Sequence, residues 1–312
     1  MATPEEHARH GPDRGDFYDW SGPRPQRAVG GRLFEMPAFY HRITCFYSVH
    51  LADHAAVRDE LPSREVEPVR WFDGSAAVQV VALRYDEVTG VVDGRPARLA
   101  PYGEVGISAL VSRHRWPRGV AMAASDRVRF GGFVLDLPVT TAEARDLGRE
   151  VFGFPKFVAD MDFRDGPGEQ AVSLSEEGTP ILDLRVRPAG RVVRVRRPWL
   201  MYSSLDNRLL ETEVPMVGHC RGRKLRPDAE LRLGDHPVAE RLRRLRVRPE
   251  PVAAATYLGL RMVLPAGVPV GSARAHPGHP GRERDRGRLT VDYIGTGPID
   301  QYAPAGGVLH VG

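Results

Sequence analysis

Apolar and polar residues alternate with a period of two along several short stretches of the chain, and this pattern predicts β-strands. The stretches AAVQVVALRY and EVGISALVS have the most pronounced β-rich character. We expect strands at residues 76–85, 104–112, 130–137, 182–195 and 257–264.

Segments with helical character are fewer, and they predict helices at residues 50–61, 141–150 and 235–245. Thr141 is suited to cap the second of these helices, which Gly153 and Pro155 should end. The third has Asp235 as its expected cap and Pro237 in its first turn. Many strands and few helices, without strict β–α alternation, predict an α+β fold around a mostly antiparallel, barrel-like sheet.

Composition divides the chain into three segments. Residues 1–30 are rich in Gly, Pro, Asp and Arg without a sustained period, and we expect a flexible N-terminal arm there. Residues 31–268 carry the strands and helices and form the expected catalytic domain. Residues 269–312 form a Gly/Pro/Arg-rich C-terminal extension, in which residues 289–294 could add one short strand.

The sequence also suggests a compartment. No run of eighteen apolar residues is present, so no membrane span is expected. The polar N-terminus does not resemble a secretory signal, and two cysteines fit a reducing environment. We therefore expect a cytoplasmic protein.

A net charge of +4 is too small to indicate nucleic-acid binding when acidic residues are interspersed along the chain. The one dense basic run, residues 241–248, lies on a predicted helix and lacks interleaved aromatic residues. A solvated or interface-forming helix face explains it better, and no nucleic-acid partner is expected.

Lysine is rare in this chain. Of 44 Lys and Arg residues, only Lys156 and Lys224 are lysines. Arginine cannot replace lysine as a nucleophilic amine, because its guanidinium stays protonated. Lys224 is surrounded by arginines in CRGRKLRP and is interpreted as a surface or anion-binding lysine.

Lys156 lies in the segment LGREVFGFPKFVADMDF, where a helix ends, the chain turns and a strand begins. Period two would place Lys156, Val158, Asp160 and Asp162 on one face of that strand. Apolar neighbours in sequence, such as Val151, would strip water from the amine and favour its neutral form. The negative C-terminus of the preceding helix would oppose this by only about 0.3–1 kcal/mol. The alternative is a strand-end lysine that reaches water or pairs with Asp160.

The motif REVFGFPK resembles the active-site signature of the acetoacetate decarboxylase family. The stretch APYGEVGISALV resembles the family strand that presents a catalytic glutamate, and LGDHPVAERLRRL resembles its late helix. The resemblance covers about residues 32–265 and implies a largely antiparallel β-barrel or cone with a few flanking helices, in agreement with the strand pattern.

By this resemblance, Lys156 would form a Schiff base and Glu104 would orient the substrate or shuttle protons. Arg42 lies near the position of a family arginine that binds the substrate carboxylate, and Tyr102, Phe152 and Phe154 would also contact the substrate. For Glu104 the alternative is a solvated strand carboxylate, and for Arg42 a surface arginine.

The chain also departs from the family pattern. Family decarboxylases commonly carry a second lysine directly after the first, and Phe157 stands at that position here. Acetoacetate decarboxylase is itself a standard example of a lysine activated by desolvation or a nearby cation. Without the second lysine, apolar surroundings must activate Lys156 alone, and the bulk of Phe152 also argues against acetoacetate itself as the substrate.

Three functions follow from these observations. The first is decarboxylation of a β-keto acid through a Lys156 iminium, and the second is an aldolase, dehydratase or cyclase acting on a 2-oxo acid in specialised metabolism. The third is a non-catalytic ligand-binding barrel. The partners expected are a small oxo-acid and, by resemblance, further copies of the chain in a homo-oligomer.

No cofactor and no metal site is expected. His50 and His54 have helical i, i+4 spacing but lack the further ligands of a zinc site, so we expect surface histidines. His219 and Cys220 are isolated from other ligand residues. His276 and His279 lie in the Pro/Gly-rich extension, where we expect them to be solvated.

Overall fold

The computed structural model describes residues 17–123, 127–166, 168–195, 197–224 and 226–282, and the backbone of residues 292–293, 301–302 and 309–310. Strands make up 56% of the structure and helices are few, which confirms the predicted fold class. Among the described residues, no helix has the length and apolar character needed to cross a membrane.

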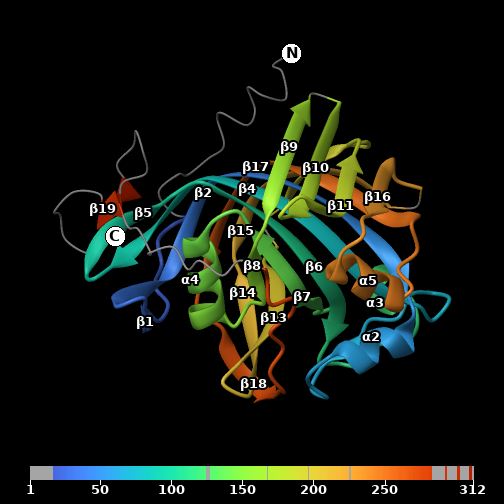
Figure 1. Cartoon of the computed structure of the whole chain (residues 1–312), viewed down its shortest axis with the longest axis horizontal. Helices are drawn as coiled ribbons and strands as arrows, with labels where there is room; N and C mark the ends of the chain where they lie inside the picture. The colour runs from blue at the N-terminus through green and yellow to red at the C-terminus, as the bar shows by residue number, and fades with distance from the viewer. Residues whose placement is uncertain are drawn as a thin grey trace.

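A 15-stranded sheet forms the body of the molecule (Figure 1). Its central path runs β12-β15-β17-β2-β4-β6-β7-β13-β14-β18, and a pairing between β12 and β18 that would close it is not found among the described residues. Its pairs are antiparallel except β7 with β8 and β7 with β13. The strands are β1 (Gln26–Val29), β2 (Arg32–Ala52), β3 (Glu67–Pro68), β4 (Ala76–Val92), β5 (Arg95–Leu99), β6 (Tyr102–Ser112), β7 (Gly131–Val139), β8 (Lys156–Val158), β12 (Val192–Val195), β13 (Trp199–Leu205), β14 (Arg208–Val214), β15 (Met216–Lys224), β17 (Pro251–Leu264), β18 (Val268–Ser272) and β19 (Asp292–Tyr293).

A smaller sheet lies beside the large one and has the order β16-β11-β10-β9. Its strands are β9 (Asp160–Gly166), β10 (Glu169–Glu176), β11 (Thr179–Val186) and β16 (Ala229–Leu233). Two further short strands pair with each other, β20 (Gln301–Tyr302) and β21 (Leu309–His310). The helices are α2 (His54–Glu60), α3 (Val120–Ala123), α4 (Ala142–Phe152) and α5 (Pro237–Arg244).

Strand β6 is buried along its whole length because both of its faces are covered. Val105, Ile107 and Ala109 point to one side, where they join the main hydrophobic core with residues of the small sheet and α5. The alternate residues Glu104 and Ser108 point to the opposite side and line an internal cavity. The period-two pattern of the sequence therefore separates core from cavity here, rather than core from solvent.

The segment that carries Lys156 follows the prediction closely. Thr141 caps α4 by accepting a hydrogen bond from the backbone N–H of Ala144 at 3.3 Å. Gly153 ends the helix in the left-handed region with a φ of 65°, which glycine adopts without a Cβ penalty. Pro155 follows, and Lys156 then begins β8 alongside β7.

The strand that begins at Lys156 is shorter than predicted. It ends at Val158, and β9 starts at Asp160 in the other sheet, so the predicted single face from Lys156 to Asp162 is wrong. Within β9 the alternation holds, because Asp160 and Asp162 are exposed while Met161 packs against the core.

Two predicted helix starts are also corrected. Residues 50–52 belong to β2, and α2 begins at His54 after an Asp53 cap, because the buried side chains of that stretch continue the strand. In α5 the cap is His236 rather than Asp235, since the ring of His236 accepts a hydrogen bond from the N–H of Val238. The predicted strand at residues 182–195 is divided into β11 and β12.

Parts of both predicted tails are described. Tyr18 is 3% exposed and its hydroxyl donates a hydrogen bond to the backbone oxygen of Tyr40 at 3.0 Å. Of the strand predicted at residues 289–294, only residues 292–293 lie within the described part, and they pair with β5. The division into three segments stays a prediction.

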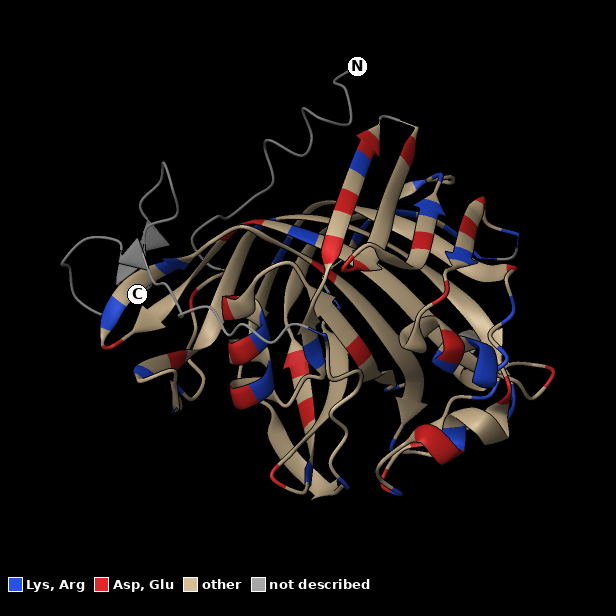
Figure 2. Ribbon diagram, viewed as in Figure 1, with Lys and Arg blue, Asp and Glu red and all other residues tan. Residues whose placement is uncertain are grey.

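Several arginines of the basic run at residues 241–248 pair with acidic residues. Arg241 lies 2.7 Å from Asp136, and Arg246 and Arg248 pair with acidic residues at 3.4 and 3.1 Å. Figure 2 shows basic and acidic positions interspersed over the ribbon. The run thus joins α5 to neighbouring elements.

Candidate active site

The two candidate catalytic residues form a buried ion pair. Lys156 Nζ lies 2.7 Å from Glu104 Oε2, and the two side chains are 6% and 8% exposed. Removing two charged groups from water is costly, and close pairing offsets part of that cost. The pairing of Lys156 with Asp160 that the sequence left open is replaced by this contact with Glu104.

Local backbone structure brings these two residues together. Lys156 lies opposite Leu137 in the β7–β8 pair, and Glu104 lies opposite Val139 in the β6–β7 pair. Strand β7 is therefore the common neighbour that places the amine beside the carboxylate. The guanidinium of Arg149 donates a hydrogen bond to the backbone oxygen of Lys156 and fixes the start of β8 to α4.

Three buried tyrosines surround the pair. The hydroxyl of Tyr85 donates to Glu104 Oε1 at 2.9 Å, and the hydroxyls of Tyr40 and Tyr102 lie 3.3 Å apart. The ring of Tyr102 lies 5.5 Å from Lys156 Nζ, within range of a cation–π contact. Burial, with the neighbouring Glu104 carboxylate, raises the pKa of Tyr40 and of Tyr85 above the usual value. These phenols therefore stay protonated, and the hydroxyl of Tyr85 is the donor to Glu104.

Lys156 and Glu104 open onto an internal cavity of about 370 Å³. This volume falls within the range of about 300–1,000 Å³ that is common for small-molecule sites. The walls are mainly apolar and aromatic. They include Tyr47, Trp71, Phe130, Trp199 and Tyr257.

The other predicted contact residues lie on both sides of the lysine. Phe154 lines the large cavity. Phe152 and Tyr102 line a second hollow of about 50 Å³, which also contacts Lys156. The rings of Phe152 and Phe154 stack with centroids 5.6 Å apart, so the turn before Lys156 presents aromatic surface to both spaces.

The structure places Arg42 away from this group. Its side chain is 65% exposed, pairs with Glu87 at 3.5 Å, and does not line either cavity. Strand β2 shifts register on both sides of Arg42, so counting residues from its neighbours does not predict its direction. Among the described residues, the cations that line the large cavity besides Lys156 are Arg197 and Lys224.

Sequence reasoning missed Tyr85 and Gly148. Tyr85 stands at the end of a predicted strand, but its contact with Glu104 depends on the β4–β6 register, which a single strand pattern does not reveal. Gly148 is an unexpected residue inside a helix and therefore carried a usable signal. A Cβ there would lie 2.3 Å from Lys156 Cδ.

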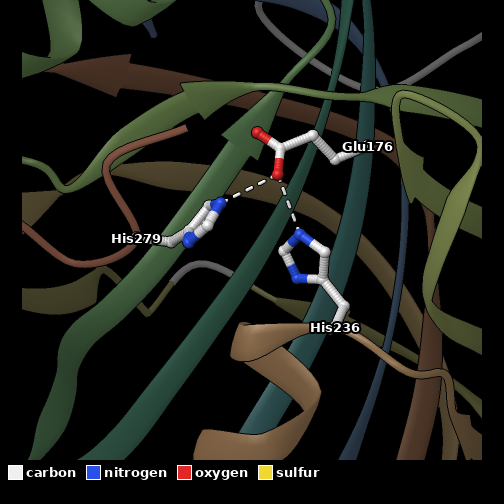
Figure 3. Close-up of side chains that lie close together, drawn as sticks. All are labelled: Glu176, His236 and His279. Carbon is white, nitrogen blue, oxygen red and sulfur yellow. Dashed lines mark hydrogen bonds and ion pairs between the residues drawn. The ribbon is translucent and has the colours of Figure 1, made fainter. Parts of the chain in front are cut away.

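A second buried polar cluster lies behind the lysine strand. Glu176 Oε2 accepts hydrogen bonds from Nε2 of His236 and Nε2 of His279, both at 2.8 Å (Figure 3). The ring of Phe157 stacks on His236 and meets His279 edge-on, with centroids 6.4 and 4.8 Å apart. The cluster therefore joins the residue after Lys156 to β10, α5 and the C-terminal segment.

The three ligand atoms of this cluster lie within 4.8 Å of one another, so it is a candidate for metal binding. However, Nδ1 of His236 accepts the N–H of Val238 at 3.2 Å, which places the ring proton on Nε2, toward Glu176. A metal ligand must present a lone pair at that nitrogen. The observed hydrogen bonds thus fit a carboxylate held by two imidazoles better than a cation site.

Predictions about three histidines were wrong. His279 is 9% exposed rather than solvated, because its backbone N–H donates to Asp136 and its ring to Glu176. His276 is half-buried, and its ring bonds to the backbone oxygen of Leu135 at 2.9 Å. His50 is fully buried in β2, where its ring bonds to Ser48 and to the backbone of Arg248.

Comparison with known proteins agrees with this fold. The model of the family described as "Acetoacetate decarboxylase (ADC)" matches residues 22–270. No curated protein is similar enough in sequence to match.

Several solved structures share the fold. An acetoacetate decarboxylase is 18% identical with a TM-score of 0.57, and the match covers 76% of this chain and 90% of that one. The acetoacetate decarboxylase of Legionella pneumophila subsp. pneumophila str. Philadelphia 1 is 16% identical with a TM-score of 0.57, with 84% and 98% covered. The enduracididine biosynthesis enzyme MppR, complexed with pyruvate, is 14% identical with a TM-score of 0.53, with 82% and 94% covered. The extent of the family match shows that this chain belongs to the acetoacetate decarboxylase family.

Proposed function

We propose that the chain is a lyase that decarboxylates a β-keto acid through an imine on Lys156. The observation that carries the proposal is the 2.7 Å contact between Lys156 Nζ and Glu104 at a cavity large enough for a small ligand. A buried amine beside a carboxylate has a proton acceptor within hydrogen-bond reach, as imine formation requires. A ligand-binding barrel without chemistry would not need a nucleophile and a base in contact.

The reaction begins when the neutral amine of Lys156 attacks the ketone carbon. Glu104 takes a proton from the Lys156 nitrogen and returns it to the former carbonyl oxygen, which also receives the nitrogen's second surplus proton and leaves as water to give an iminium. The bond to the carboxylate carbon then breaks, carbon dioxide departs, and the electron pair moves into the iminium to give an enamine. Protonation at carbon and hydrolysis release the ketone and restore Lys156. Tyr85 holds Glu104 in place throughout, through its hydrogen bond to Oε1.

The test is reductive trapping. The protein is incubated with acetoacetate and with larger β-keto acids, reduced with borohydride and mapped by peptide mass spectrometry. We expect an adduct on Lys156 together with release of carbon dioxide. The chain has only one other lysine, Lys224, so the assignment is direct.

Matched variants sharpen this test. Lys156→Arg keeps a cation beside Glu104 but cannot form an imine, so the adduct should disappear. Lys224→Arg should leave the adduct unchanged. If no oxo-acid in a broad panel is trapped on Lys156, the proposal fails and the ligand-binding barrel is favoured.

A second candidate is a condensation or dehydration on a 2-oxo acid, which uses the same imine. A cavity of about 370 Å³ has room for an acid and an aldehyde together. The related MppR has been solved with pyruvate and with the condensation product of pyruvate and imidazole 4-carboxaldehyde. Trapping of pyruvate, with a product that depends on an added aldehyde, would favour this candidate over decarboxylation.

We also propose that the chain forms a homo-oligomer. The edge strand β12 exposes Val192 and Val193, which are 44% and 55% exposed, and exposed apolar edges favour strand pairing. Sedimentation should give a mass above the 34.5 kDa of one chain. Val193→Glu should shift it toward the monomer, and a monomeric wild type would contradict the proposal.

A further inference from the structure

Arg197 and Lys224 share the lining of the active-site cavity with Lys156, but their surroundings differ. Lys156 is buried, whereas Arg197 and Lys224 are exposed. The cavity therefore has a dry end at Lys156 and Glu104 and a solvent-facing end that carries two basic side chains.

Strand register places Lys224 far from the reacting amine. Lys224 pairs with Ala253 on the neighbouring strand. Successive strand pairings then lead across the sheet from Ala253 to Val49, Gln79 and finally Ser108. Ser108 is four residues beyond Glu104 on β6, which is roughly 13 Å along the strand at about 3.3 Å per residue. Lys224 thus belongs to the row of residues at the far end of the cavity.

Arg197 lies at the same end. It donates a hydrogen bond to the backbone oxygen of Val128 at 2.5 Å, and its guanidinium lies 5.9 Å from the centre of the Phe130 ring. The next residues, Gly131 and Gly132, pair with the end of β6 at Val111 and Leu110. By contrast, Lys156 pairs with Leu137, five residues farther along β7, which is roughly 16 Å.

The space between these ends is apolar. Val81 and Leu83 line it from β4, and the rings of Tyr47, Trp199 and Tyr257 line it from β2, β13 and β17. Such a wall favours a hydrocarbon or aromatic body over a polar one. A short acid such as acetoacetate, with its ketone at Lys156, would not reach most of this wall or either distal cation.

We propose that the cavity takes elongated oxo-acids, with a ketone at Lys156, an apolar body along β4 and β6, and an anionic group at Arg197 and Lys224. This names the substrate class of the proposed Lys156 chemistry and rests on it. The distal anion is separate from any carboxylate lost in the reaction, because a β-carboxylate lies too near the ketone to reach these cations.

The experiment compares three methyl ketones by borohydride trapping on Lys156. One is the oxo-dodecanoate whose ketone adjoins the terminal methyl group, the second is methyl decyl ketone, which has the same chain without the acid, and the third is the short acid levulinate. We expect the oxo-dodecanoate to half-saturate at a concentration about tenfold below the other two, since it alone combines a chain that covers the apolar wall with an acid at the distance of the cations.

Variants test the cations directly. Arg197→Gln and Lys224→Gln should each raise the half-saturating concentration of the oxo-dodecanoate about three- to tenfold and leave that of methyl decyl ketone unchanged. Arg223→Gln is the matched control, because Arg223 adjoins Lys224 on β15, is exposed and does not line the cavity. This control variant should change neither half-saturating concentration.

The outcomes separate the two proposals. If all three ketones are trapped on Lys156 with similar half-saturation and the variants change nothing, the elongated-substrate inference is overturned while imine chemistry stands. If no ketone is trapped, octanoate is titrated into the intact protein by calorimetry. Binding that Arg197→Gln and Lys224→Gln weaken would support the distal anion site without imine chemistry, and no binding would overturn it.

Discussion

The side chain of Lys156 passes directly over Gly148 of α4, so that a Cβ on Gly148 would lie 2.3 Å from Lys156 Cδ and 2.6 Å from Cε. Alanine is a better helix former than glycine, so Gly148→Ala removes a helix defect but obstructs the lysine. We expect the trapping rate on Lys156 to fall at least about tenfold, because a displacement of about 1 Å can cost a factor of about 10². Single-turnover borohydride reduction with a saturating ketone measures this trapping rate.

Gly168→Ala is the control for this prediction, because a Cβ at Gly168 would meet nothing within 4 Å. It should leave the trapping rate at the wild-type value. An unchanged rate in Gly148→Ala would show that the Lys156 side chain can move away from α4 while its Nζ atom keeps its reactive position.

Replacing Glu104 with glutamine should leave the site folded but slow the chemistry. The amide oxygen of the substituted side chain can still accept the hydroxyl of Tyr85, but the amide cannot take the proton of Lys156. We expect the rate of imine formation to fall by a factor of about 10²–10⁴, the usual contribution of a positioned general base. Asp160→Asn, which changes an exposed carboxylate on β9, should have no effect. Equal rates in Glu104→Gln and wild type would remove Glu104 from the mechanism.

The lysine segment could be predicted from the sequence because its signals are local. A cap at Thr141, a left-handed glycine at Gly153 and a proline act within a few residues of where they stand, and each had the predicted effect. The rarity of lysine and the apolar neighbours of Lys156 drew attention to it, and the resemblance of REVFGFPK to the family signature decided the choice.

The remainder of the site depends on contacts between distant strands. Tyr85 reaches Glu104 through the register of β4 with β6, and Arg42 faces outward beside register shifts in β2. His279 is buried because Asp136 and Glu176 hold a Pro/Gly-rich segment that composition alone describes as a linker. A period-two pattern shows which residues share a face, but not which partner strand covers that face.

Acid should destabilise the protein through His41. Burial, with the charges of Arg261, Arg98 and Arg42, lowers the pKa of His41 to about 4. The unfolded chain binds this proton below about pH 6.5, whereas the folded chain binds it only near pH 4. The part of the unfolding free energy that depends on neutral His41 is therefore complete above pH 6.5 and is lost as the pH falls from about 6.5 to about 4.

Urea unfolding at about pH 4.5 and about pH 7.5 measures this effect, which should be about 2.5 kcal/mol for these two pKa values. His41→Gln keeps an acceptor for Thr89, and it should remove most of this change in unfolding free energy between the two pH values. His114→Gln, on an exposed ring, should not. Equal slopes in His41→Gln and wild type would show that other groups carry the acid sensitivity.

The Glu176 cluster should stabilise the rear of the active site without metal. Burial opposes the charge of Glu176, but hydrogen bonds from His236, the N–H of Arg282 and His279 outweigh it and lower the pKa of Glu176. Glu176→Gln places an amide N–H against imidazole donors, so we expect a loss of about 2–4 kcal/mol in unfolding free energy. Because the folded-state pKa is lowered, this difference should be full at neutral pH and shrink as the pH falls through that pKa.

The control is Glu177→Gln, on the adjacent exposed residue, which should leave the unfolding free energy unchanged. Chelator should leave the wild-type melting temperature unchanged, whereas a fall with chelator and recovery with zinc would establish a metal site and overturn this account.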